Sequence, residues 1–173
     1  MKARPQIPMV LIMLLGALVI RQEAVALTAD RQHPIHIQAD TAVMDDTKGT
    51  SIYRGNVIIE QGTLLINADE IEIITSNREV IQIIATADSD SKKLAHYEQL
   101  PDDSDDRVIA DARKIVYLVQ EERLHLSGNG TLKQAKDVLK GELIYYDVRQ
   151  GIMSLKSTSK DGRIDMTINP KGN

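Results

Sequence analysis

The chain has 173 residues and a formal net charge of −4, and it contains no Cys, no Trp and no Phe. Without Cys it cannot form disulfides, a Cys-ligated zinc site or a thiol nucleophile. An acidic balance without a dense Lys/Arg run argues against a nucleic-acid-binding protein. The apolar fraction of 42% is ordinary for a folded domain, so we expect a core of Ile, Val and Leu almost without aromatic rings.

The first 26 residues have the pattern of a secretory signal peptide. Lys2 and Arg4 precede the uncharged, mostly apolar run 9–20, and Ala24-Val25-Ala26 offers an A-x-A cleavage site. An uncleaved membrane anchor is the alternative, but a spanning helix needs about 20 apolar residues. We therefore predict cleavage after Ala26 and an exported mature chain, 27–173, that forms a single domain.

Many short runs of the mature chain alternate apolar and polar residues. Examples are 35–39, 64–68, 115–119 and 164–168. Such alternation predicts half-buried β-strands, and the abundance of Ile, Val and Thr suits a pleated surface. Turn-forming residues separate the runs, as in 45–49. Because no long segment has the period of an amphipathic helix, we predict an all-β fold.

Two segments of the chain resemble each other at a constant spacing. Residues 55–61 align with residues 128–134 at an offset of 73, and both segments begin with Gly-Asn. Hairpin units that repeat in this way can bury their apolar faces only by stacking on one another. We therefore expect an elongated stack of hairpins, in which Gly55 and Gly128 supply bulges or bends that let the sheet curl.

The sequence lacks the motifs of an enzyme or a metal centre. It has no phosphate-binding loop, no nucleophile elbow and no H-E-x-x-H zinc motif. His33 and His36 have no third ligand nearby, and the acidic run 102–106 lacks the spacing of a calcium loop. Acidic residues also recur at related places of the repeat: Asp40, Asp69, Asp111 and Glu142. Their recurrence indicates a structural role, so we predict a protein that is not an enzyme and needs no cofactor or metal.

Several segments carry a resemblance to a known family. Residues 34–40, 53–63 and 66–69 closely resemble the LptA (OstA-like) family of periplasmic lipopolysaccharide-transport proteins, and residues 126–129 and 171–173 look similar as well. The resemblance covers essentially the whole mature chain. It implies an open, twisted β-jelly roll of antiparallel strands that binds the lipid A acyl chains of lipopolysaccharide between two curved sheets.

The resemblance also implies which residues contact the lipid. By position, the family's lipid-contacting residues fall on Ile35, Ile37, Tyr117 and Val119, and on His96, where relatives commonly carry an apolar aromatic residue. Inward-facing aliphatic residues of the alternating strands are expected to complete the lining: Val57, Ile59, Leu64, Ile66 and Leu126.

Partners follow from the same resemblance. Members of the family associate end to end and connect an inner-membrane complex, through the membrane-anchored LptC, to the outer-membrane translocon LptD. A stack of hairpins that does not close leaves edge strands to which another chain can add a strand. We expect an N-terminal edge at 35–39 and a C-terminal edge at 162–168, with the pairing residues Ile35, His36, Ile37, Ile164, Met166 and Ile168.

Two other functions stay open at this point. The chain could be the LptC-like component of the same pathway, whose N-terminal helix is not cleaved. It could also be a periplasmic carbohydrate-binding β-protein, although sugar sites usually use aromatic platforms and only five Tyr are present.

Overall fold

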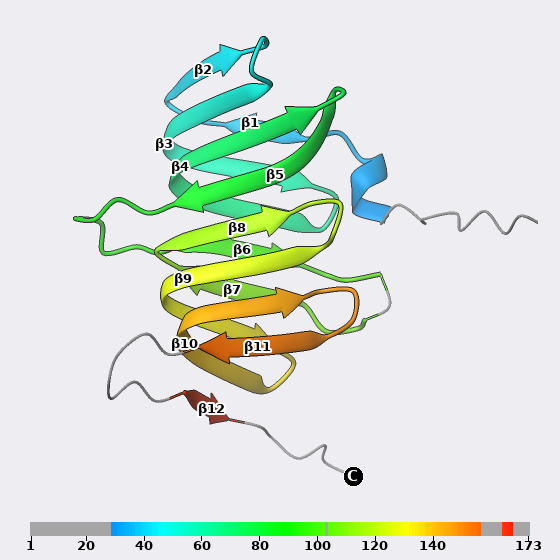
Figure 1. The fold of residues 1–173 in the computed structure, drawn as a ribbon, viewed down its shortest axis with the longest axis vertical. Coiled ribbons are helices and arrows are strands. Elements are labelled where there is room, and N and C mark those ends of the chain that lie inside the picture. The colour runs from blue at the N-terminus through cyan, green and yellow to red at the C-terminus, as the bar shows by residue number, and fades with distance from the viewer. Residues whose placement is uncertain (1–28, 103, 157–163, 168–173) are drawn as a thin grey trace, which may run out of the picture.

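The computed structural model describes residues 29–102, 104–156 and 164–167. The predicted signal peptide and the predicted edge residue Ile168 lie outside these ranges. Within them the chain forms one short 3-10 helix, η1 (Ala29–Gln32), and twelve strands joined into antiparallel ladders (Figure 1). None of the described helical residues belongs to a helix that is long and apolar enough to cross a membrane.

The strands differ in length, and four of them have eleven to thirteen residues. In chain order they are β1 (His36–Gln38), β2 (Thr41–Asp45), β3 (Thr50–Gln61), β4 (Leu64–Ser76), β5 (Glu79–Thr86), β6 (Ala95–Gln99), β7 (Val108–Ala112), β8 (Lys114–Leu118), β9 (Arg123–Gln134), β10 (Asp137–Asp147), β11 (Ile152–Lys156) and β12 (Asp165–Thr167).

The long strands β3, β4, β9 and β10 pass from one layer of the molecule to the other. In β3, for example, residues 50–54 pair with β2, whereas residues 58–60 pair with β1. The pairings define a front sheet, β2-β3-β4-β5-β8-β9-β10-β11, and a back sheet, β1-β3-β4-β6-β7-β9-β10-β12. Figure 1 shows these layers one behind the other. The predicted all-β, twisted jelly-roll class is thereby confirmed.

Glycines with a left-handed backbone mark two of the places where strands change layer. Gly55 has a φ of 81° and Gly128 a φ of 79°, and each is followed by an Asn with positive φ. The β3–β4 ladder shifts register between Arg54 and Val57, directly across this dipeptide. Glycine adopts positive φ without a steric penalty, and Asn tolerates it better than most residues. The bend predicted at these glycines is present.

The strands form two consecutive units of the same design. Strands β1, β2 and β3 correspond to β7, β8 and β9 at the predicted offset of 73 residues, and the bounds of β2 and β8, and of β3 and β9, match residue for residue. The units meet where β5 pairs with β8 in the front sheet and β6 pairs with β7 in the back sheet. We call this meeting place the internal junction.

The core lies between the two sheets and is mainly aliphatic. Its buried residues are Ile, Leu, Val and Ala, together with the tyrosines Tyr97, Tyr117 and Tyr146. The rings of Tyr97 and Tyr117, from opposite sheets, meet edge to face with their centroids 5.3 Å apart. The expectation of a core with few aromatic rings fits, but the rings that are present lie deep inside it.

The two long sides of the sandwich differ. On one side, which we call the crossing side, the backbone of the long strands runs from sheet to sheet through the glycine bends. On the opposite side, which we call the open side, the sheets end in hairpin turns, such as those joining β3 to β4 and β8 to β9. Helix η1 lies on the open side (Figure 1).

Candidate functional site between the two sheets

Most of the predicted lining residues lie between the sheets. Six are buried in the core, with at most 4% of their surface exposed: Val57, Ile59, Leu64, Ile66, Tyr117 and Leu126. Three others are half-buried and pack against that core: Ile35, Ile37 and Val119. The structure therefore brings these nine side chains into one apolar interior.

His96 lies on the opposite face of its strand. Its neighbours Ala95 and Tyr97 are buried, and alternation along β6 turns the His96 ring outward. There its Nδ1 is 2.8 Å from Asp111 Oδ1 on β7, and this hydrogen bond is the main cause that raises the pKa of His96. The same alternation was already readable in the sequence, where Ala95, Tyr97 and Gln99 form the inward set.

A narrow recess, with a cavity volume of only about 10 Å³, enters the interior from the open side. Its walls combine aliphatic residues of both sheets with a polar rim, and its lining consists of Asp30, Arg31, Ile35, Gln61, Leu64, Val80, Ile83, Gln99, Tyr117 and Val119. Four of these are predicted lining residues. The recess therefore lies between the sheets, on the open side.

Helix η1 supplies the charged part of that rim. Asp30 is only 5% exposed, and its carboxylate accepts hydrogen bonds from the Thr63 N–H (2.6 Å), the Thr63 hydroxyl (2.7 Å) and the Gln99 side-chain amide (2.9 Å). Arg31 donates to the Val119 carbonyl and to Glu122 Oε1, the latter at 3.3 Å. Sequence reasoning missed both residues, because their partners lie 33 to 91 residues away along the chain.

The tyrosines beneath this rim are almost completely buried, with Tyr97 0% and Tyr117 2% exposed. Burial raises the pKa of Tyr117 to about 12, and burial also raises the pKa of Tyr97 well above its usual value. Both shifts have the same physical cause, because a tyrosinate is poorly solvated away from water. Such an environment suits saturated hydrocarbon and disfavours charged or strongly hydrated ligands.

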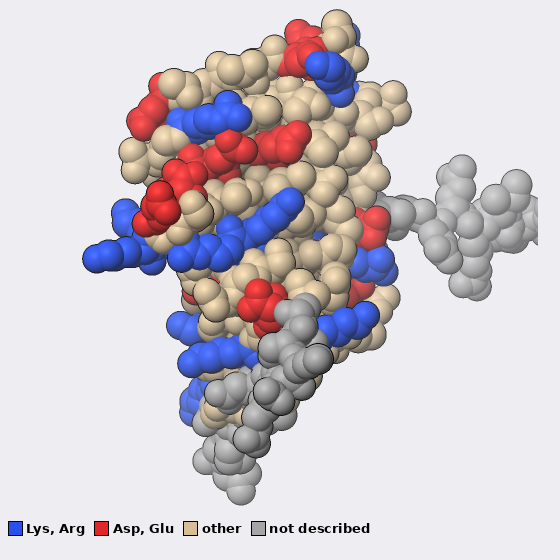
Figure 2. Space-filling model, turned by 60° about the vertical axis from the view of Figure 1, so that its left-hand side comes forward, with Lys and Arg blue, Asp and Glu red and all other residues tan. Residues whose placement is uncertain are grey.

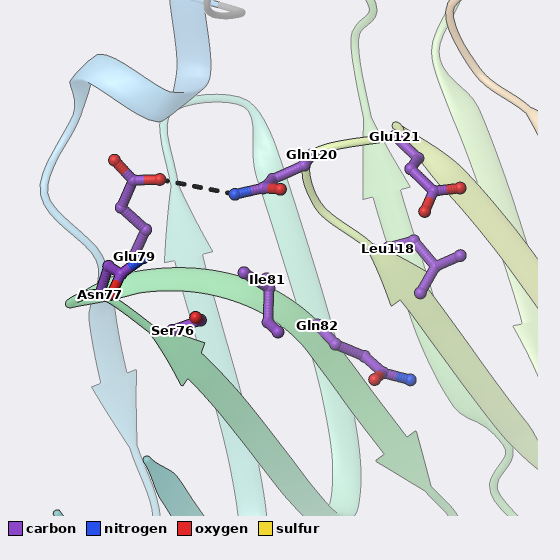
Figure 3. Close-up of a pocket in the computed structure, with 8 residues that line it drawn as sticks. All are labelled: Ser76, Asn77, Glu79, Ile81, Gln82, Leu118, Gln120 and Glu121. Atoms are coloured by element: carbon purple, nitrogen blue, oxygen red, sulfur yellow. Dashed lines mark hydrogen bonds between the residues drawn. The ribbon is translucent and has the colours of Figure 1, made fainter.

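Other hollows lie on the outside of the sheets and are more polar. One, of about 800 Å³, lies between the β4–β5 and β8–β9 turns, where Gln120 donates a hydrogen bond to Glu79 at 3.5 Å (Figure 3). Its lining otherwise mixes Ser, Asn and Gln with Ile81 and Leu118. A second, of about 960 Å³, lies beside the first glycine bend and includes His96. Neither offers the continuous aliphatic wall that the interior has.

Both ends of the molecule carry strands with one free edge. Among the described residues β1 and β2 each pair only with β3, and β11 and β12 each pair only with β10. The large exposed apolar residues lie mostly at these ends: Val43, Met44, Ile152, Ile164 and Met166. The predicted edges therefore coincide with β1 and β12, while β2 and β11 form a second edge at each end that the sequence did not predict.

Charge is spread rather than concentrated. Figure 2 shows Asp and Glu alternating with Lys and Arg in bands on the face that it presents, so no continuous basic surface covers that face. Over the part of the chain that the structure describes, no three His, Asp or Glu residues are grouped so that they could hold a metal ion.

Comparison with known proteins gives consistent matches. The family described as "LptA/(LptD N-terminal domain) LPS transport protein" matches residues 36–152. The chain is 32% identical over 154 residues to the lipopolysaccharide export system protein LptH of Pseudomonas aeruginosa, covering 86% of each chain. It is 31% identical to LptA of Escherichia coli K12 over 147 residues, which covers 85% of this chain and 77% of that protein.

A solved structure agrees with the sequence matches. The crystal structure of LptH, described as the LptA-homologous periplasmic component of the lipopolysaccharide transport device of Pseudomonas aeruginosa, superposes with a TM-score of 0.71 at 31% identity. The superposition covers 82% of this chain and 99% of that structure. With its twelve-stranded sandwich, its aliphatic interior and these matches, the chain belongs to the LptA/LptD N-terminal domain family of lipopolysaccharide-transport proteins.

Proposed function

We propose that this chain is a periplasmic lipopolysaccharide carrier, not an enzyme, which holds the acyl chains of lipid A between its two sheets and forms part of a bridge between the inner and outer membranes. The observation that carries the proposal is the apolar interior, lined from both sheets and approached from one open side. Membership of a lipopolysaccharide-transport family supports the choice of ligand.

The interior has the chemistry that acyl chains need. Transfer of hydrocarbon out of water gains about 0.8 kcal/mol for each buried methylene. The proposed contacts are the nine inward residues Ile35, Ile37, Val57, Ile59, Leu64, Ile66, Tyr117, Val119 and Leu126. His96 is left out of this set because its ring faces away from the interior and is bound to Asp111.

Recognition should rest on the lipid tails more than on the phosphates. The chain is acidic overall, and loss of residues 1–26 removes three basic residues and one acidic residue, which makes the mature chain more acidic still. An acidic protein attracts anionic headgroups weakly. A carrier that binds chiefly by hydrocarbon burial can also pass its ligand to a neighbour of the same kind without breaking strong ion pairs.

The interior is filled by side chains in this structure, so acyl chains can enter only if the sheets part. On the crossing side the backbone of four long strands ties the sheets together, whereas on the open side, within the described ranges, the sheets are joined through side chains. We therefore place lipid entry on the open side, at the recess lined by Ile35, Leu64, Tyr117 and Val119.

The internal junction is the basis for proposing head-to-tail association. There the last strands of the first unit, β5 and β6, pair with the first strands of the second unit, β8 and β7. At the C-terminal end β11 and β12 occupy the places of β5 and β6, and at the N-terminal end β2 and β1 occupy the places of β8 and β7. A second copy can thus continue both sheets, and a contact between unlike ends gives an open row instead of a ring.

This correspondence gives the register of the proposed contact. In β10–β11, Asp147 pairs with Ile152, as Ile74 pairs with Gln82 in β4–β5. Transferring the β5–β8 register then places Ile152, Met153, Ser154, Leu155 and Lys156 opposite Asp45, Met44, Val43, Ala42 and Thr41 of the next copy. In the back sheet, Asp165, Met166 and Thr167 fall opposite Gln38, Ile37 and His36.

The same free ends suit the partners expected at the two membranes. An LptC-like inner-membrane protein and an LptD-like outer-membrane translocon would each add strands to one end of the row. The alternative within the pathway, a membrane-anchored LptC-like chain, differs in its N-terminus. Sequencing the exported protein decides between them: a start at Leu27 supports the carrier, and an intact N-terminus supports the anchored component.

Lipid binding can be tested with neighbouring substitutions on β1. Ile37 packs against the core, whereas Gln38 is exposed. Ile37→Asp should abolish co-purification of lipopolysaccharide from the periplasm, and Gln38→Asp should not, with circular dichroism showing that both variants are folded. Full retention of lipid by folded Ile37→Asp would contradict the proposed site, and binding of delipidated sugar alone would favour a carbohydrate-binding protein.

The register can be tested by disulfide formation, since the chain has no Cys of its own. Directly opposite residues of antiparallel strands have Cβ atoms about 4.5–5.5 Å apart, close enough to be bridged after small adjustments. Met153→Cys combined with Met44→Cys should give covalent oligomers under mild oxidation. The control pair, Ser154→Cys with Met44→Cys, is one residue out of register and on opposite faces, so it should give few. Equal cross-linking of both pairs would contradict the register.

A further inference from the structure

We propose that η1 is a releasable latch across the open side of the interior, and that lipid enters only after the latch has let go. This inference rests on the proposed function, because it describes how the same interior is opened. We use "latch" for the side chains of Asp30 and Arg31 together with their hydrogen bonds.

The two residues of the latch hold different sheets. Asp30 is bound to Thr63, in the turn between β3 and β4, and to Gln99, at the end of β6, both in the back sheet. Arg31 is bound to Val119 and Glu122, which lie between β8 and β9 in the front sheet. Consecutive residues of one short helix therefore connect the two sheets on the side where, among the described residues, no strand passes from one sheet to the other.

The latch also lies over the recess. Asp30 and Arg31 line it together with Ile35, Tyr117 and Val119, which belong to the proposed lipid lining. An acyl chain that came in from the open side at this place would meet η1 before it reached the tyrosines. Moving η1 outward would expose the apolar wall that the helix now covers.

A polar latch suits repeated opening. In the closed state Asp30 is buried but has three donors, so its desolvation is compensated. Arg31 is less well satisfied, because its Nε is buried without a hydrogen-bond partner. In the open state both side chains regain water. The net free energy of closure is therefore modest, unlike that of an apolar plug, which would lose its hydrophobic burial on opening.

The second unit is closed differently. There the Tyr146 hydroxyl, in the front-sheet part of β10, donates to Gln134 Oε1 at the end of β9 in the back sheet, at 2.9 Å. This contact joins residues of the core strands themselves. A separate segment that could swing away is found only beside the recess, among the residues that the structure describes.

The experiment measures how fast fluorescently labelled lipid A passes from detergent micelles to the full-length mature protein. Asp30→Ala breaks the latch from η1, and Glu122→Gln weakens it from the front sheet without changing η1. Glu122 Oε1 also accepts from Arg149 at 2.7 Å, so Arg149→Gln, which removes that contact and leaves the one to Arg31, is the control for Glu122→Gln. Loss of hydrogen bonds to charged groups shifts such an equilibrium by about tenfold or more. We expect uptake and release to accelerate by that factor in both variants. Gln32→Ala, an exposed residue of the same helix, is the control and should leave both rates unchanged.

Hydrogen exchange in the wild-type protein gives a second readout that needs no variant. The Thr63 N–H is bound to Asp30, so lipid A should increase its exchange rate if binding releases the latch. Normal transfer with unchanged rates in both variants, or unchanged Thr63 exchange on lipid binding, would overturn the latch and leave the carrier function standing. Absence of any lipid A transfer to the wild-type protein would overturn both.

Discussion

The internal junction and the free ends of the molecule are built from the same strands but differ in what covers them. At the junction Tyr117 of β8 is 2% exposed, because β5 and β6 of the first unit cover it. The equivalent residue at the N-terminal end, Met44 of β2, is 64% exposed. A position that is buried where two units meet is therefore an exposed apolar residue at the free N-terminal end. Each free end thus presents the equivalents of the strands that one unit contributes to the internal junction.

The largest difference in stability should come from truncating the equivalent side chains at the internal junction and at the N-terminal end. Tyr117→Ala should lower the free energy of unfolding by about 3 kcal/mol or more, since it leaves a cavity opposite Tyr97. Met44→Ala should change it by no more than about 0.5 kcal/mol in the monomer. Urea unfolding followed by circular dichroism at low protein concentration measures both. Similar losses would show that the N-terminal end is already covered in solution.

The two glycine bends offer a second comparison. A Cβ on Gly55 would lie 2.8 Å from the Asp40 Cβ, and one on Gly128 would lie 2.8 Å from the Arg113 Cβ. Left-handed backbone costs a residue with a side chain about 1–2 kcal/mol, and the crowding adds about 1 kcal/mol or more. We therefore expect Gly55→Ala and Gly128→Ala to destabilise the fold by about 2–3 kcal/mol each.

Gly151 is the matched control for the glycine variants. It has a φ of 64°, but nothing lies within 4 Å of a Cβ placed on it. Gly151→Ala should therefore lower the free energy of unfolding only by the cost of left-handed backbone, about 1 kcal/mol. Adding Asp40→Gly, which removes the crowding Cβ, should relieve Gly55→Ala and leave Gly128→Ala unchanged. If all three glycine variants lost the same stability, crowding at the bends would be unimportant.

The back-sheet part of the junction should depend on pH. The hydrogen bond to Asp111 raises the pKa of His96, so protonated His96 stabilises the fold. That contribution is fully present below the unfolded pKa of about 6.5 and is lost as the pH rises through the raised folded value.

Asp111→Asn should therefore cost about 1 kcal/mol more at about pH 5.5 than at about pH 8.5, in urea unfolding experiments. The equivalent position at the N-terminal edge is Gln38, which does not titrate. Gln38→Asn is the control and should show no such pH dependence. A pH-independent cost for Asp111→Asn would contradict the role of the pair.

The smallest effect is expected for an ion pair that only the first unit has. Arg54 Nε lies 2.6 Å from Glu70 Oε2, but both side chains are exposed, 51% and 40%. The equivalent positions of the second unit are Ser127 and Leu143. Since exposed pairs contribute little, Arg54→Gln should change the midpoint of urea unfolding by an amount worth at most about 0.5 kcal/mol. A larger loss would mean that this pair helps to fix the first bend.

Local features of the fold could be predicted from the sequence. Alternation revealed the strands, and the Gly-Asn repeat fixed the offset between units because turn chemistry is local. Alternation along 95–99 also contains the orientation of His96, which the family resemblance alone had placed in the lining.

Contacts across the open side could not be predicted in this way. Arg31 contacts Glu122, 91 residues away along the chain. Nothing in a stretch such as Ala-Asp-Arg-Gln shows that one of its side chains, Asp30, is buried. The second edge strand at each end, β2 or β11, was missed for a similar reason. Its place depends on which part of a long strand it pairs with, and that pairing is not visible in the local sequence. These features follow from the packing of two complete units.

The passage of four strands from sheet to sheet makes the molecule mechanically asymmetric. Continuous backbone joins the two sheets along the crossing side, whereas along the open side the sheets end in hairpin turns. If the sheets part, we expect the chain to bend at Gly55 and Gly128, where the backbone already has a positive φ, and the hydrogen-bonded ladders within each sheet to stay intact. The gap can therefore widen by degrees at small cost in strand pairing. If the proposed carrier opens in this way, we expect it to accept lipid A species that differ in the number and length of their tails.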